Sequence, residues 1–185
     1  MAGLVKSAPA AYVTGMQRHK PRRKQPELTL VGEVDEWEAE VLQQLLKLPQ
    51  GSSCTFYIDS SGGSVYGALA VMALIRLRHL QACAVVLSEC SSAALLVFGA
   101  CQKRLVNPLG TFLFHRMRWQ SEKRVASEEA RHWAAHFEHL ERELDELLAR
   151  LFAPAQELVR TWIREGRYVT GRELVQAGLA ELLPL

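Results

Sequence analysis

An alternation of short apolar runs, glycine- or serine-rich turns and amphipathic segments constrains the fold of this chain more than any other feature. Residues 54–58 are mainly β-branched and aromatic, which predicts a buried strand, and this run breaks at the turn 59–63. A helical pattern follows over residues 64–79. The same unit repeats as an apolar strand at 82–87 and a helix at 93–99. Strands that alternate with helices predict one α/β domain with parallel strands, right-handed crossovers and turns gathered at one edge.

The same pattern extends on both sides of these two units. Apolar residues fall on alternate positions within 28–34, which predicts a strand. Asp35 is expected to cap the helix that follows and that ends before Pro49. Two more short strands are expected at 105–106 and 111–114.

The carboxyl-terminal third is predicted to be helical, with one helix of unusual length. An amphipathic pattern over 127–152 predicts a rod of about 40 Å at 1.5 Å per residue. Since a rod of this length exceeds the width of a small domain, part of it is expected to project and to contact another subunit. Pro154 ends this helix, a shorter one runs to Arg164, and a last helix is expected over 170–178.

Composition and charge exclude several classes of protein. The chain has 185 residues, of which 49% are hydrophobic, so it can form one full core but not two large domains. No apolar run approaches the roughly 18 residues that span a bilayer, which argues against a membrane protein. Residues 1–26 carry a charge of +6 and no acid, and the remaining 159 residues carry −4. This flexible basic tail suits solvent, phosphates or an acidic surface, and nucleic-acid binding is not expected of the chain.

The amino-terminal sequence and the spacing of the cysteines indicate the cellular compartment. The amino terminus lacks the apolar core of a signal peptide, although an arginine-rich leader without acids also suits an organellar transit peptide. The cytoplasm is the expected compartment. The four cysteines show no paired spacing and lie among apolar residues, which predicts reduced, buried thiols rather than disulfides or a zinc site; they are Cys54, Cys83, Cys90 and Cys101.

Three separate segments carry residues suited to acyl transfer. Gly62 and Gly63 form a turn between a strand and a helix, where backbone N–H groups can approach a ligand. Ser92 occupies the next strand-to-helix turn, and a serine there is either a helix cap or a nucleophile. His115 ends an apolar strand and supplies an imidazole. Because turns after parallel strands meet at one edge, we expect a hydroxyl, an imidazole and N–H donors for an oxyanion to converge.

The same segments resemble the proteolytic subunit of the Clp protease family, within the superfamily that it shares with crotonases. The resemblance rests on YIDSSGGSV at 57–65, on Ser92 29 positions after Gly63, on His115, and on RYVT followed by ELVQAGL within 167–179. It covers about residues 27–181 of a domain expected at 27–185. It implies stacked ββα units with a projecting helix, Ser92 as nucleophile, His115 as base, and N–H groups of Gly63 and Ala93 as oxyanion donors.

The chain departs from the family pattern at the third position of the catalytic triad. Where the family has an aspartate before an Arg-aromatic pair, this chain has Gly166. A triad carboxylate fixes the imidazole tautomer and stabilises the imidazolium, and losing it can lower turnover about 10⁴-fold. Glu165 is one residue away and is expected to be solvated, so a backbone carbonyl or water is an alternative partner for His115. The residues before the nucleophile also depart from the family, which leaves Ser91 and Cys90 open as alternatives to Ser92.

Two other groups of residues offer weaker alternatives. Lys103 suits a Ser–Lys arrangement but lies in a polar turn, where ordinary solvation is expected. His132, His136 and His139 share one face of the long predicted helix and suit zinc at a subunit contact, although no fourth ligand is evident nearby. A polar helix face is the simpler interpretation.

Together with these residues, the family resemblance implies a serine endopeptidase-like subunit that hydrolyses unfolded or short polypeptides inside a homo-oligomeric ring. The resemblance implies that an ATP-driven unfoldase of the AAA+ class is a possible partner, and no metal or organic cofactor is required. Two alternatives stay open. One is a catalytically impaired or inactive subunit that acts as a structural or regulatory partner in such a ring, and the other is a crotonase-type acyl-CoA enzyme.

Overall fold

The computed structural model describes residues 25–120 and 124–184. The predicted tail at 1–26 therefore lies almost entirely outside the described residues. In chain order the elements are β1 (Glu27–Glu33), α1 (Val34–Lys47), β2 (Ser53–Gly62), α2 (Val65–Leu77), β3 (Gln81–Cys90), α3 (Ala94–Ala100), β4 (Lys103–Val106), β5 (Thr111–Phe114), α4 (Ser127–Leu151), α5 (Gln156–Glu165), β6 (Arg167–Thr170), α6 (Gly171–Gln176) and β7 (Glu181–Leu182).

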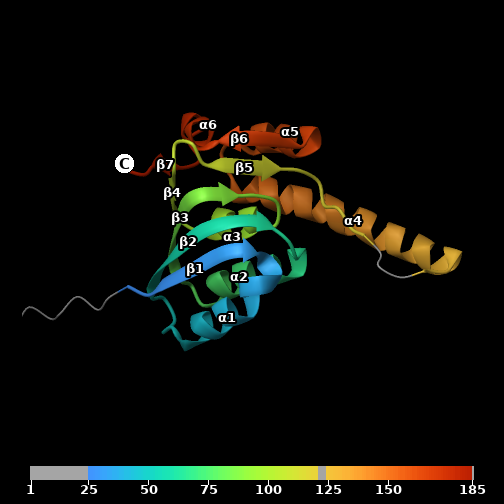
Figure 1. Cartoon of the computed structure of the whole chain (residues 1–185), viewed down its shortest axis with the longest axis horizontal. Helices are drawn as coiled ribbons and strands as arrows, with labels where there is room; N and C mark the ends of the chain where they lie inside the picture. The colour runs from blue at the N-terminus through green and yellow to red at the C-terminus, as the bar shows by residue number, and fades with distance from the viewer. Residues whose placement is uncertain (1–24, 121–123, 185) are drawn as a thin grey trace, which may run out of the picture.

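The predicted parallel sheet is confirmed. Five strands lie in the order β1-β2-β3-β4-β7, and every neighbouring pair is parallel. The apolar run that predicted a buried strand is the centre of β2, in which Cys54, Phe56 and Ile58 are completely buried. Helices α1, α2 and α3 pack on one face of the sheet, as Figure 1 shows. The turns that leave β2 and β3 lie at the same edge, because their strands run in the same direction.

A small second layer carries the third segment of the site. β5 joins β3 through one residue pair, Glu89 with Thr111, and pairs with β6 as an antiparallel strand over four residues. Neither β6 nor β7 was predicted from the sequence. Aromatic contacts fix β5 against the helices, since the ring of Phe114 lies 5.6 Å from that of Phe152 and 5.2 Å from that of Trp162.

Helix α4 projects from the body of the molecule, as its length predicted (Figure 1). It has 25 residues, and the ones buried among the described residues all lie between Leu144 and Leu151. The carboxyl-terminal end of α4 thus packs on the core, while its amino-terminal part extends beyond it.

Two local predictions need comment. Asp35 was expected to cap α1, but Glu33 occupies that position and forms a capping box with Glu36. Three of the four cysteines are buried as predicted, and Cys83 is half-buried. No helix in the described ranges is long and apolar enough to cross a membrane.

Candidate active site

Ser92 lies in the turn between β3 and α3, in a backbone conformation that side chains rarely adopt. Its φ is +54°, in the left-handed region, which costs about 1–3 kcal/mol for a residue other than glycine. Hydrogen bonds to β5 hold the turn there. The Ser92 amide donates to the carbonyl of Leu113 over 2.9 Å, and the Leu113 amide donates to Oγ of Ser91 over 3.2 Å. The two adjacent serines thus differ in their contacts, because the Ser91 hydroxyl accepts a hydrogen bond from a backbone amide.

The other alternative in this turn is Cys90. It is completely buried, and this burial raises the pKa of its thiol well above the ordinary value. A buried thiol without a cationic neighbour is a poor source of thiolate, which is the nucleophilic form. Ser91 and Cys90 are therefore both poorly suited to attack a substrate, which leaves Ser92, whose side chain is only half-buried, as the candidate nucleophile.

The glycine turn after β2 lies directly against Ser92. A Cβ atom at Gly62 would lie 2.6 Å from Cβ of Ser92 and 2.9 Å from the carbonyl oxygen of Ser91, and φ at Gly62 is +107°. Any larger residue would clash with the turn and strain the backbone. The close approach of the two turns, expected from their place at one edge of the sheet, therefore depends on glycine at this position.

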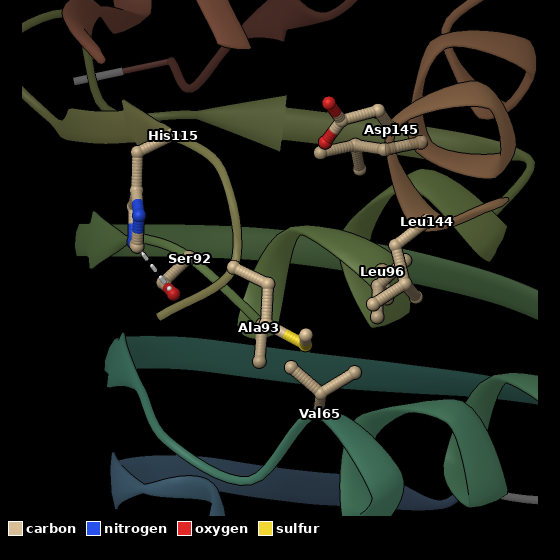
Figure 2. A pocket seen from close by; sticks show the side chains of 9 residues that line it. Val65, Ser92, Ala93, Leu96, His115, Leu144 and Asp145 are labelled. Carbon is tan, nitrogen blue, oxygen red and sulfur yellow. Dashed lines mark hydrogen bonds between the residues drawn. The ribbon is translucent and has the colours of Figure 1, made fainter. Parts of the chain in front are cut away.

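His115 follows directly after β5 and contacts Ser92. Its Nε2 lies 2.8 Å from Oγ of Ser92 (Figure 2). Its Nδ1 lies 2.6 Å from the carbonyl oxygen of Arg116. A carbonyl oxygen only accepts hydrogen bonds, so Nδ1 must carry the proton. The lone pair of Nε2 then faces the Ser92 hydroxyl, which is the tautomer that a general base needs.

Position 166, where the family resemblance leads one to expect a triad carboxylate, holds glycine. β5 and β6 pair up to Phe114 with Arg167, so His115 and Gly166 come next in the two strands. Gly166 ends α5 with a φ of +64°, and no heavy atom lies within 4 Å of where its Cβ would be. Glu165 is exposed, as expected. The orienting contact of the imidazole comes instead from the Arg116 carbonyl, one of the two alternatives that the sequence left open.

The expected oxyanion donors lie in the two turns beside Ser92. Among the described residues, the amide of Ala93 makes no hydrogen bond. Gly63 lies one residue beyond the glycine that touches Ser92, and its loop is held by Asp35, whose Oδ2 accepts a hydrogen bond from the Ser64 amide over 3.1 Å. The carboxylate expected to cap α1 thus fixes the glycine loop.

A pocket opens beside Ser92 and His115, between α2, α3 and the carboxyl-terminal end of α4 (Figure 2). Asp145 lines this pocket from the long helix α4, a place that no sequence pattern indicated. Burial, together with the nearby Glu141, raises the pKa of its carboxyl group to about 6 against the opposing effect of Arg116. The remaining lining is apolar: Val65, Ala93, Leu96, Met117, Leu144 and Leu148.

The two weaker alternatives find no support in the structure. Lys103 is the first residue of β4 and pairs with Cys83 near the start of β3, whereas Ser92 follows the end of β3. The described residues contain no group of three histidine, cysteine or acidic side chains that could hold a metal ion. Of the three histidines on α4, His136 instead lies 3.4 Å from the hydroxyl of Tyr66.

The chain was compared with models of known protein families. The family model described as Clp protease matches residues 21–183, which is most of the chain. None of the curated proteins compared with the chain matches it.

Proposed function

Because the chain belongs to the Clp protease family, we propose that it is a serine peptidase subunit that hydrolyses peptide bonds in unfolded or short polypeptides. The observation that carries the proposal is the 2.8 Å contact between Nε2 of His115 and Oγ of Ser92, in the tautomer that accepts the hydroxyl proton. A nucleophile and a base in this relation are the minimum requirement for acyl transfer.

In the proposed reaction, Oγ of Ser92 attacks the carbonyl carbon of the scissile bond while Nε2 of His115 takes the hydroxyl proton. The N–H groups of Gly63 and Ala93 bind the oxyanion that forms. His115 then gives the proton to the departing amine as the C–N bond breaks, which leaves the acyl group on Ser92. A water molecule attacks this ester and passes its proton through His115 back to Oγ, which releases the carboxylic acid.

The Arg116 carbonyl performs one of the two tasks of a triad carboxylate. It selects the tautomer, because it accepts the hydrogen bond of Nδ1. It stabilises the imidazolium only as a dipole, however, and a dipole interacts with a positive charge more weakly than an anion does. We therefore expect turnover below that of an enzyme with a complete triad, by less than the roughly 10⁴-fold loss that follows when the wrong tautomer is imposed.

The proposal includes assembly into a homo-oligomeric ring with an internal chamber, located in the cytoplasm and open to an unfoldase of the AAA+ class. Its support is the projection of α4, whose described buried residues all lie in its last third. No residue in the amino-terminal part of this helix is buried by the described part of the chain, so it offers a surface for contact with another subunit. An inactive structural or regulatory subunit of the same ring is the second candidate, and the observation that favours it is glycine at position 166.

A fluorophosphonate probe, which reacts with activated serines, separates the two candidates. We expect the assembled protein to be labelled, with the adduct mapped by mass spectrometry to Ser92, and to lose labelling in Ser92→Ala and His115→Ala. Gln102→Ala, in a turn away from the site, is the matched control and should be labelled normally. If the assembled wild-type protein is not labelled at all, the peptidase proposal fails and the inactive subunit is favoured.

A further inference from the structure

Among the described residues that line the pocket beside Ser92, Asp145 is the one with an acidic side chain. Its carboxylate extends from α4 toward the side of the pocket on which His115 lies, above Leu144 and Leu96 (Figure 2). Leucine, valine and methionine side chains form most of the remaining wall. An ionised carboxylate in such surroundings loses hydration that the apolar wall does not replace, so it favours a ligand that brings hydrogen-bond donors.

The neighbouring charges compensate Asp145 only in part. Its Oδ2 lies 3.9 Å from Nε of Arg116, and Nη1 of the same guanidinium lies 3.6 Å from Glu141. Both distances exceed those of a direct hydrogen bond, and more than half of the Arg116 side chain is exposed. Two carboxylates thus share one guanidinium, which leaves a formal charge of −1 at this end of the pocket.

The acidic neighbour on the other side does not change this balance. Glu146 is engaged by Arg160, whose Nε and Nη2 donate to its two oxygens over 3.0 and 2.8 Å. Arg160 is therefore committed to another carboxylate. The oxygens of Asp145 keep capacity to accept hydrogen bonds from a group that enters the pocket.

We propose that Asp145 makes this pocket select a substrate side chain with a long apolar stem and a cationic end, as in lysine, at a position next to the cleaved bond. The inference rests on the proposed peptidase function and names its substrate class. The methylene stem packs on the leucine, valine and methionine side chains, while the ammonium group reaches the carboxylate at the pocket wall. The same carboxylate repels an acidic side chain.

Norleucine provides the matched comparison, because it has the apolar stem of lysine without the charge. Partly exposed ion pairs contribute on the order of 1 kcal/mol, so we expect lysine to be preferred over norleucine about fivefold in kcat/KM. A glutamate peptide should be the poorest of the three. Without the carboxylate, this preference for lysine should disappear, since no group of the pocket wall would then offset the hydration that the ammonium group loses.

The experiment measures kcat/KM for peptides that differ only in lysine, norleucine or glutamate before the cleaved bond, at pH 8, with wild type and Asp145→Asn. We expect the lysine-to-norleucine ratio to fall about fivefold in Asp145→Asn while the norleucine value changes little. Glu138→Gln, an exposed acid on the same helix that is paired with Arg142 outside the pocket, is the control and should leave the ratio unchanged. An equal ratio in wild type and Asp145→Asn would overturn the inference.

Failure of the peptidase function gives a different result from failure of this inference. If no peptide is cleaved and the fluorophosphonate probe does not label Ser92, the proposed function fails. The ratio of dissociation constants for the lysine and norleucine peptides, measured by fluorescence anisotropy, then replaces the kinetic ratio. Loss of the lysine preference in Asp145→Asn would still support the pocket assignment, and an unchanged ratio would still refute it.

Discussion

Restoring a carboxylate at position 166 tests whether the missing charge is what limits the site. Gly166 follows α5 at the place where the next pair of β5 and β6 would set it opposite His115. There is space for a side chain, because no heavy atom lies within 4 Å of the position that a Cβ atom would take there. In an antiparallel pair, directly opposed residues project to the same face. Gly166→Asp is therefore expected to place its carboxylate near Nδ1 of the imidazole.

Two opposing effects set the size of the change. A carboxylate about 4 Å from the imidazolium interacts with it by at most about 4 kcal/mol at the effective dielectric of a protein surface. The Arg116 carbonyl already supplies part of this stabilisation, and solvent screens the rest. We expect the rate to rise about tenfold to a hundredfold, which corresponds to about 1.4–2.7 kcal/mol of barrier. The left-handed φ of +64° costs about 1 kcal/mol with any side chain, although aspartate tolerates it better than most.

The assay is the second-order rate of fluorophosphonate labelling at Ser92, with the melting temperature measured in parallel. Gly166→Asn is the matched control, because asparagine has the same shape and the same tolerance of left-handed backbone but no charge. Both variants are expected to lose about 2–4 °C in Tm, and only the aspartate variant should react faster. Equal labelling rates in the two variants would refute the reasoning that a missing anion limits the site.

Two further predictions concern acidic side chains near the site. Because burial raises the pKa of Asp145 to about 6 in the folded chain, above the unfolded value of about 3.9, its charge opposes folding above pH 6 and this cost disappears below pH 4. Asp145→Asn should therefore raise Tm at pH 8 and leave it unchanged near pH 3.5, as thermal melts can check; a lower Tm at pH 8 would contradict the sign. Asp35→Ala removes the acceptor of the Ser64 amide and should lower kcat about tenfold with little change in KM, because the glycine loop that carries the Gly63 amide loses an anchor. Asp35→Asn retains an acceptor and should stay near wild type, and a change confined to KM would show that the loop does not act on the oxyanion.

The helices and strands that were predicted correctly are those whose sequence pattern lies within the element itself. β2 and β3 have apolar β-branched cores, and the length of α4 follows from a pattern that repeats along the helix. β6 was missed because its four residues are mostly exposed and carry no strong strand pattern. It exists because β5 lies beside it and pairs with all four of its residues, which is a tertiary contact. The strand propensity of the residues themselves does not reveal such a partner.

The same distinction holds for the candidate site. The contact between Ser92 and His115 was expected, because turns after parallel strands converge and because a family resemblance named both residues. The sequence left open whether a carbonyl or water is the partner of Nδ1. Every residue has a backbone carbonyl, so no residue type indicates which one accepts this hydrogen bond. The place of Asp145 in the pocket was not predicted for a related reason. It follows Leu144, at the edge of the apolar face of α4, and whether that edge meets solvent or a pocket depends on how the helix packs on the core.

In this site, Arg116 takes over part of the role that a carboxylate has in a catalytic triad. Its carbonyl orients the imidazole, while its side chain forms long and largely exposed ion pairs that contribute at most about 1 kcal/mol each. Those ion pairs are too weak to fix a main-chain oxygen. The rigid element is instead the strand before it, because Phe114 is completely buried and packs edge-on against Phe152. The tautomer of His115 is therefore set by the backbone that directly follows β5, which the aromatic contacts of that strand hold in place. The part of a triad that a backbone cannot supply is the negative charge.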